Sequence, residues 1–467
     1  MFTTNYWDSI DGTNKPSFIG EIEDVWYFAF ESSPITLDIN DGSRRKFLYV
    51  DESKNIFSGE VGPDAKITSS GLPLGGDATS ENGIYNGVPD WVYEEEMLAS
   101  RSAAWWSPNG DNIVFVKFNT TMEENVEYNY YAQSSDQAGR ADDFLVKDKN
   151  DRYPQVERIP YSKPGGEIAS YQVVFCSGLV DSRLKAPQCQ IISEVEGLAN
   201  NELFVRVSFT NDVHLDQSNK DILSLFYVVT QNRIGSASSY LECYYGTENG
   251  LKCEAKNELD ETTMIGDKFT GWVDSGAIMN DPFKSQPWLF RIAYKYDQCN
   301  SLEAFNKNDG SKKDLIDGDG VCIQSVNAIG RPVEGDELTT DYSILFYASV
   351  KGKSWERHVY QISYEGLVKD ADNWKPIKLE DWNCLTCKTY ESRECSYGGL
   401  SLAKDRQFGM FSCYGPDVPY YLNFYMGLDG KVIIPGIDSV DGYPLLEDAT
   451  ESNSQLIADL ESKKWPR

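Results

Sequence analysis

The stretch Asp90–Met97, DWVYEEEM, places three consecutive glutamates directly after two large aromatic residues. Neighbouring carboxylates repel one another, and the nearest basic residue along the chain is Arg101. An acidic run of this kind is most often a solvated turn. Trp91 and Tyr93, however, favour burial, which would hold the glutamates on a packed surface. The stretch therefore predicts a fixed group of carboxylates that binds a cation.

The composition indicates a folded, acidic protein. The 467 residues are 40% hydrophobic and 13% aromatic, with a net charge of −30. That length suffices for two or three ordinary domains, or for one large domain built from repeats. The negative charge argues against nucleic acid or an anionic membrane surface as a partner. The longest apolar run, residues 222–229, has the length of a strand, and we find neither a signal peptide nor a transmembrane segment.

Short strand-like runs and turns alternate along the whole chain, and helical periodicity is almost absent. The runs are residues 46–50, 56–57, 113–118, 202–209, 343–349, 358–363, 408–412 and 420–425. Their recurrence in weakly similar modules of roughly 40 to 60 residues favours an all-β propeller over a sandwich. The polar stretch 306–320 is expected to be a surface loop.

The ten cysteines are even in number, and most fall into close pairs. They stand at Cys176 and Cys189, Cys243 and Cys253, Cys384 and Cys387, Cys395 and Cys413, and, more widely spaced, Cys299 and Cys322. This pattern fits a disulfide framework of an oxidising compartment. Cys384-Leu-Thr-Cys387 also fits a redox-active pair or half of a zinc site. His214 and His358 are the only histidines and neither lies at ligand spacing, so no metal or other cofactor is predicted. Asn119-Thr-Thr is a glycosylation sequon and agrees with secretion.

Several motifs together resemble the N-terminal β-propeller of the dipeptidyl peptidase IV family. They are residues 86–96, 102–110, 118–121, 127–128, 153–154, 159–164, 270–273, 384–387, 395, 413–416 and 446–448. The resemblance begins near residue 47, so we expect a divergent segment or partial blade over 1–46 and a propeller domain over 47–467. It implies an eight-bladed propeller that caps an α/β-hydrolase domain.

The resemblance also implies a binding site. Family members release dipeptides from peptide N-termini, preferring proline or alanine second, and the residues matching Glu95 and Glu96 bind the free α-ammonium. Trp91 and Tyr93 are expected to support that pair. The implied disulfides are Cys243–Cys253, Cys299–Cys322, Cys384–Cys387 and Cys395–Cys413, which leaves Cys176 with Cys189. The segment Tyr153–Gly166 resembles an arm that contributes to homodimers. An extracellular, secretory or cell-surface location follows from the same resemblance.

Catalytic residues are not predicted in this chain. Ser396 is preceded by Glu394 where the nucleophile motif Gly-x-Ser-x-Gly needs glycine, and no Ser/His/Asp triad is recognisable. A substrate-facing Arg and Phe of the family also lack counterparts, since Val273 is followed by Asp274-Ser-Gly-Ala277. Two functions remain open. One is a gating and anchoring propeller for a serine hydrolase domain outside the chain, and the other is a non-catalytic module that binds a membrane or extracellular protein.

Overall fold

The computed structural model describes the chain in segments. They are residues 25–26, 36–37, 44–51, 55–61, 67–79, 82–107, 112–130, 155–178, 187–192, 203–209, 222–235, 237–246, 250–256, 259–260, 279–280, 287–293, 300–317, 321–329, 343–387, 395–402, 408–415, 419–426 and 432–433. Within them no helix is long and apolar enough to cross a membrane.

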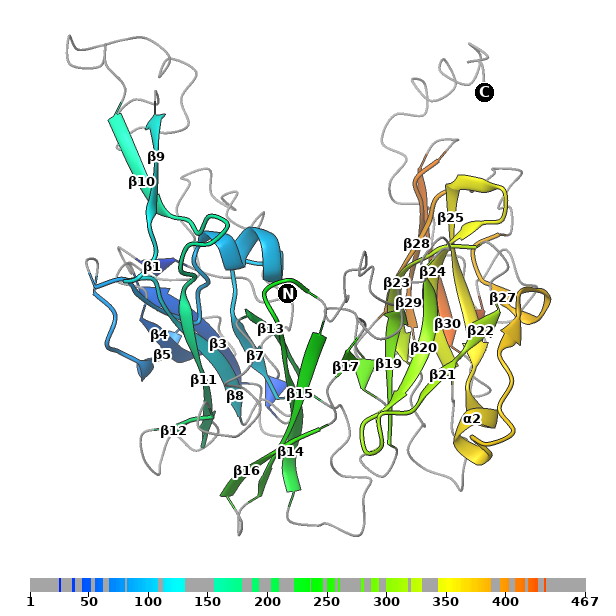
Figure 1. The fold of residues 1–467 in the computed structure, drawn as a ribbon, viewed down its shortest axis with the longest axis horizontal. Coiled ribbons are helices and arrows are strands. Elements are labelled where there is room, and N and C mark those ends of the chain that lie inside the picture. The colour runs from blue at the N-terminus through cyan, green and yellow to red at the C-terminus, as the bar shows by residue number, and fades with distance from the viewer. Residues whose placement is uncertain are drawn as a thin grey trace.

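The described residues form six antiparallel sheets that follow one another along the chain (Figure 1). Sheet 1 contains β1 (Val25–Trp26), β2 (Thr36–Leu37), β3 (Arg44–Asp51), β4 (Ile56–Val61) and β5 (Ile67–Gly75). Sheet 2 contains β6 (Ile84–Asn86), β7 (Ala104–Trp106), β8 (Ile113–Asn119), β11 (Ser170–Ser177) and β12 (Gln188–Ile191). Sheet 3 contains β13 (Leu203–Phe209), β14 (Ile222–Gln231), β15 (Ala237–Gly246), β16 (Gly250–Ala255) and β17 (Leu259–Asp260).

The second half of the chain repeats the pattern with four-stranded sheets. Sheet 4 contains β18 (Met279–Asn280), β19 (Trp288–Ala293), β20 (Ser301–Asn306) and β21 (Lys312–Asp314). Sheet 5 contains β23 (Ile323–Ile329), β24 (Ser343–Val350), β25 (Lys353–Ser363) and β27 (Asn383–Cys384). Sheet 6 contains β28 (Gly398–Leu402), β29 (Phe408–Cys413), β30 (Tyr420–Met426) and β31 (Val432–Ile433).

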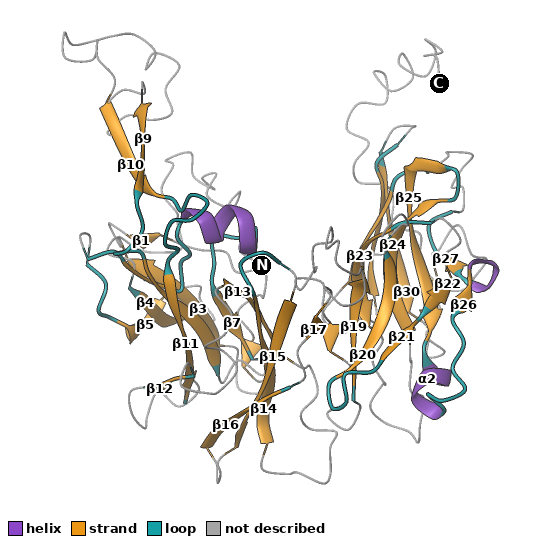
Figure 2. Cartoon of the chain, viewed as in Figure 1, coloured by secondary structure: helices purple, strands orange, loops and turns teal. Residues whose placement is uncertain are grey.

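The remaining elements are short and lie outside these sheets. A ribbon of β9 (Asn125–Tyr130) and β10 (Gln155–Pro160) projects from the rest of the molecule (Figure 1). β22 (Ile316–Asp317) pairs in parallel with β26 (Ile377–Lys378). The helical elements are the π-helix η2 (Tyr93–Leu98), α2 (Glu365–Lys369) and the 3₁₀ turn η6 (Leu379–Asp381), and Figure 2 shows how few helices accompany the strands.

Among the described residues the hydrophobic core consists of five clusters, and each joins one sheet to the next in chain order. Sheets 1 and 2 share one cluster, sheets 2 and 3 the next, and so on to sheets 5 and 6. In β14, Phe226 and Val228 pack toward sheet 2, whereas Tyr227 and Val229 pack toward sheet 4. Alternate residues of a strand point to opposite faces, so each inner sheet is buried on both sides. Face-to-face packing of successive four- or five-stranded sheets is the β-propeller architecture that the sequence predicts. The number of blades stays a prediction.

A buried polar contact ties sheet 3 to the turn after β20. Lys307 Nζ donates to Glu242 Oε2 at 2.6 Å and to the Tyr227 hydroxyl at 2.9 Å. The Tyr227 hydroxyl in turn donates to Glu242 at 2.5 Å. Burial opposes ionisation of Glu242, but Lys307 outweighs it and holds the pKa of that carboxyl below its usual value. A buried charge is tolerated only when paired in this way.

The prediction of a surface loop over 306–320 agrees with the turn at 308–311 but is wrong for residues 312–316. Residues 312–314 form β21, and Leu315 and Ile316 are buried in the cluster between sheets 4 and 5. The many Asp, Lys and Gly residues of the stretch conceal these two apolar side chains.

Candidate functional site: the η2 helix

The acidic stretch folds into a short helix at the edge of sheet 2 (Figure 2). Asp90 starts it, because its carboxylate accepts a hydrogen bond from Val92 N at 3.2 Å and its carbonyl accepts one from Glu94 N at 2.9 Å. Ala99 ends it in the left-handed region, with φ 46° and ψ 38°. Its N–H bonds back to the carbonyl of Glu94, five residues earlier, which gives the wide turn of a π-helix.

Tyr93 fixes the helix to the core. Its side chain is 1% exposed, its ring lies 4.7 Å from that of Phe118, and its hydroxyl accepts a hydrogen bond from Phe204 N at 3.3 Å. Phe118 belongs to sheet 2 and Phe204 to sheet 3, so one side chain holds η2 across two sheets. The expected burial is confirmed for Tyr93 but wrong for Trp91, which is 41% exposed with its ring 5.1 Å from Tyr161.

The three glutamates have different surroundings. Glu94 is half-buried and forms an ion pair with Arg101, with Nε and Oε1 3.1 Å apart. Glu95 and Glu96 are exposed and have no hydrogen bond or ion pair within the described part of the chain. Arg101, the nearest basic residue along the chain, is therefore paired with the first glutamate. The second and third carboxylates stand next to each other on a rigid support with their charge uncompensated by these segments.

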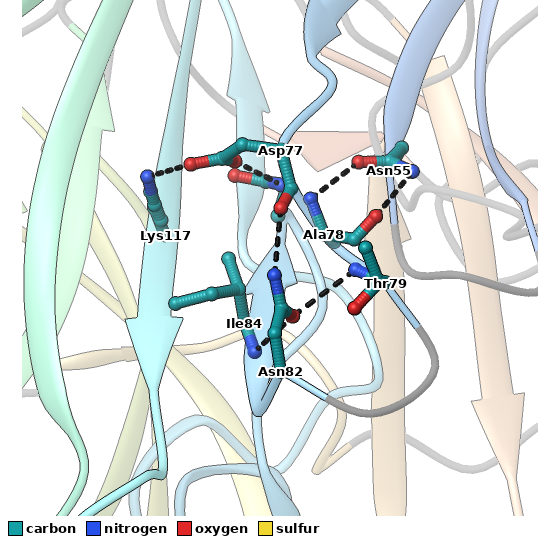
Figure 3. Close-up of polar contacts among 8 residues, drawn as sticks. Asn55, Asp77, Ala78, Thr79, Asn82, Ile84 and Lys117 are labelled. Atoms are coloured by element: carbon teal, nitrogen blue, oxygen red, sulfur yellow. Dashed lines mark hydrogen bonds and ion pairs between the residues drawn. The ribbon is translucent and has the colours of Figure 1, made fainter.

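The segment between β5 and β6, which precedes the helix in the chain, is held by a network of polar contacts (Figure 3). Asn55 both donates to Ala78 O at 3.0 Å and accepts from Ala78 N at 2.8 Å. Asp77 accepts from Lys117 and, at 3.1 Å, from Asn86 Nδ2. The side chain of Asn82 accepts hydrogen bonds from Thr79 N and Ile84 N and donates one to Asp77 O. Because β6 leads directly into residues 87–90, this network fixes the position from which η2 begins.

Two buried acids lie at the base of the helix. Asp90 is 2% exposed, and burial, followed by the charge of Glu123, raises its pKa to about 7. Burial also raises the pKa of Glu123, although Ser162 Oγ donates to it at 2.9 Å. Asp90 Oδ1 and Glu123 Oε2 have no hydrogen-bond partner among the described residues. The helix therefore stands over a carboxyl that gains or loses its proton near neutral pH.

The other predicted residues lie apart from η2. The structure contains the disulfides Cys176–Cys189, Cys243–Cys253, Cys384–Cys387 and Cys395–Cys413. Cys322 is also disulfide-bonded. Asn119 ends β8, and its side chain accepts a hydrogen bond from Thr121 N at 3.0 Å. Of the predicted arm Tyr153–Gly166, residues 155–166 are described and begin with β10. Cys299, His214, residues 153–154, 270–277 and 446–448 lie outside the described segments.

Sequence reasoning does not predict the positions of two polar residues, one beneath η2 and one beside the Cys384–Cys387 turn. Glu123 comes 33 positions after Asp90 in a polar turn, and no local pattern distinguishes it. His358 lies beside Cys384 and Cys387, although 26 positions separate it from the first of them. Only the pairing of β25 with β27 brings these residues together.

Comparison with known proteins places these features in a family. Dipeptidyl peptidase 4 of Felis catus is 26% identical over 347 residues, covering 73% of this chain and 38% of the relative. Prolyl endopeptidase FAP of Bos taurus is 24% identical, covering 81% of this chain and 41% of the relative. Dipeptidyl aminopeptidase B of Saccharomyces cerevisiae is 26% identical, covering 72% and 34%. The chain thus spans less than half the length of these relatives.

A solved structure shares the fold. The crystal structure of Porphyromonas gingivalis dipeptidyl peptidase 4 superposes with a TM-score of 0.52 at 13% identity, covering 83% of this chain and 44% of that one. The profile of the dipeptidyl peptidase IV N-terminal region matches residues 43–420, a range that includes η2 and the strands from β3 to β29. This chain therefore belongs to the dipeptidyl peptidase IV N-terminal region family.

Proposed function

We propose that this chain admits peptides and anchors their free N-termini for a serine dipeptidyl peptidase whose hydrolase domain lies outside it. The observation that carries the proposal is the state of the glutamates on η2. Arg101 pairs with Glu94, while Glu95 and Glu96 stay exposed and adjacent. Two carboxylates satisfy the three N–H donors of an α-ammonium with charge-assisted hydrogen bonds.

Anchoring the amine defines where the peptide is cut. A substrate held by its first nitrogen presents its second peptide bond at a fixed distance from the anchor, which suits release of N-terminal Xaa-Pro or Xaa-Ala dipeptides. An internal peptide nitrogen carries no charge and at most one N–H, so it gains less from Glu95 and Glu96 than an α-ammonium does. The chemical step belongs to the hydrolase domain, and this chain contributes positioning.

The secretory pathway or the cell surface is the location that this proposal requires. It is supported by the four disulfides between described cysteines and by the sequon at Asn119, a half-buried residue at the end of β8. Glycosylation of Asn119 is part of the proposal.

A second candidate function is a non-catalytic module for a membrane or extracellular protein. It is favoured by the β9–β10 ribbon, on which Tyr128 is 46% and Val156 56% exposed. Exposed apolar side chains on a projecting ribbon are typical of a protein contact. A homodimer formed through this arm is the simplest such contact.

Calorimetric titration with an Xaa-Pro peptide and its N-acetylated form tests the anchor. We expect the free amine to bind at least about 10-fold more tightly, because acetylation removes the charge that strengthens these hydrogen bonds. The double variant Glu95→Gln/Glu96→Gln should lose that preference. Glu94→Gln is the matched control and should keep it, since Glu94 pairs with Arg101. Equal affinity for the two peptides in the wild type would refute the anchoring role.

A further inference from the structure

The turn that contains Cys384 and Cys387 has a third potential metal ligand. The register of β25 and β27 places Tyr360 opposite Cys384 and Gln361 opposite Asn383. Continuing this register brings His358 next to the turn, and the ligand atoms of His358, Cys384 and Cys387 all lie within 4.8 Å of one another. Among the described residues this is the only such group of histidine, cysteine and carboxylate side chains.

Thr386 holds the imidazole of His358 in place. Nδ1 of His358 lies 3.0 Å from Thr386 Oγ1, which also accepts a hydrogen bond from Val359 N at 3.0 Å. His358 is 4% and Thr386 1% exposed, so neither side chain is free to turn away. A histidine that binds metal through one ring nitrogen usually has its other nitrogen fixed by such a partner. Because Thr386 contacts Nδ1, Nε2 is the ring nitrogen that we assign to the metal.

The two sulfurs have the spacing and accessibility that a metal site needs. Cys-x-x-Cys is the spacing of zinc ligands, and thiolate with imidazole is a donor set that Zn²⁺ prefers. Cys384 is half-buried and Cys387 exposed, so a reductant reaches this bridge. The disulfides Cys176–Cys189, Cys243–Cys253 and Cys395–Cys413 form no such three-ligand group with a described histidine or carboxylate.

We propose that Cys384, Cys387 and His358 form a Zn²⁺ site that the Cys384–Cys387 disulfide closes and its reduction opens. A dithiol reductant gives two electrons and two protons to the bridge and becomes a disulfide itself, leaving two thiols. Zn²⁺ then displaces both thiol protons and is bound by two thiolates and the imidazole, with water in the fourth position. The same residues thus hold either a covalent bridge or a metal ion.

Site-resolved alkylation of the full chain tests this. The protein is reduced with dithiothreitol, transferred to reductant-free buffer under argon, and treated with iodoacetamide with or without Zn²⁺. Mass spectrometry then reads each cysteine. We expect Zn²⁺ to slow alkylation of Cys384 and Cys387 at least about 10-fold, because a thiolate bound to the metal is no longer free to attack iodoacetamide. Mg²⁺, which prefers oxygen ligands, should protect neither cysteine.

Variants separate the site from general thiol binding. His358→Gln should lose most of the protection, and Thr386→Val should weaken Zn²⁺ binding several-fold because the ring is no longer held. His214→Gln replaces the other histidine and should behave as the wild type. The proposal is overturned if Zn²⁺ protects neither Cys384 nor Cys387, if Mg²⁺ protects them equally, or if His358→Gln is protected as well as the wild type. Circular dichroism checks that each reduced protein stays folded. Should His358→Gln unfold, the Zn²⁺ and Mg²⁺ comparison in the wild type and in Thr386→Val decides.

Discussion

The hydroxyl of Tyr93 accepts a hydrogen bond from the backbone N–H of Phe204 at 3.3 Å, 111 positions along the chain. This contact connects the helix that presents Glu95 and Glu96 with the first strand of sheet 3. The position of the proposed anchor therefore depends on the packing of two sheets, and not on the conformation of the acidic stretch alone.

Tyr93→Phe removes this contact while keeping the buried ring. We expect a loss of about 1–2 kcal/mol in the free energy of unfolding, because a buried hydrogen bond is broken. Binding of a free-amine peptide should weaken as well, since η2 loses its tether to sheet 3. Urea denaturation and calorimetry measure the two effects. Tyr128→Phe on the exposed ribbon is the control and should change stability by less than about 0.5 kcal/mol. Unchanged stability of Tyr93→Phe would contradict the tether.

Asp90 should make stability depend on pH. Its pKa is raised from 3.8 to about 7, so the folded chain keeps a proton that the unfolded chain releases in this range. The free energy of unfolding should therefore fall as pH rises between these two values and level off above about pH 7. Asp90→Asn keeps an acceptor for Val92 N–H without a charge. It should be the more stable protein at about pH 8, by up to roughly 4 kcal/mol.

Urea denaturation of both proteins at about pH 5 and pH 8 measures this difference. Glu123→Gln removes the neighbouring charge and should lower the pKa of Asp90, which moves the pH dependence toward acid. If wild type and Asp90→Asn lose the same stability between the two pH values, Asp90 is not the titrating group.

Lys307→Met should be among the most damaging single changes in the described core. It leaves Glu242 buried with Lys256, at 3.3 Å, as its remaining ion-pair partner among the described residues. Removing one partner of a buried ion pair typically costs about 3–5 kcal/mol. Lys369→Met breaks an exposed pair with Glu365 and is the control, with an expected cost below about 1 kcal/mol. Thermal unfolding compares the two, and similar midpoints would contradict the structural role of Lys307.

The sequence predicts the sheets well because strands in this fold are local in the chain. Residues 113–118 and 343–349 are apolar on both faces because each strand packs against a neighbouring sheet on either side, and this pattern predicts a strand from sequence. The loop predicted over residues 312–316 is wrong for the opposite reason. Its buried residues Leu315 and Ile316 are too few to outweigh its polar neighbours.

The sequence predicts only some of the residues at the η2 site. Glu95 and Glu96 follow from one contiguous motif, and Tyr93 was expected to be buried beneath it. Trp91 was expected to be buried as well, but it lies at the surface beside Tyr161, a residue of the distant ribbon segment. Glu123 lies near Asp90 only through the fold, because it belongs to a turn 33 positions further along the chain, and spacing along the sequence does not reveal such a neighbour.

The alternation within β14 has a consequence for folding fidelity. A slip of one residue would turn Phe226 and Val228 toward sheet 4 and Tyr227 and Val229 toward sheet 2, so both interfaces would be mismatched together. The hydroxyl of Tyr227 would also leave Glu242 and Lys307. The register of β14 is thus specified by side-chain packing on both of its faces and by the polar contact of Tyr227 with Glu242 and Lys307.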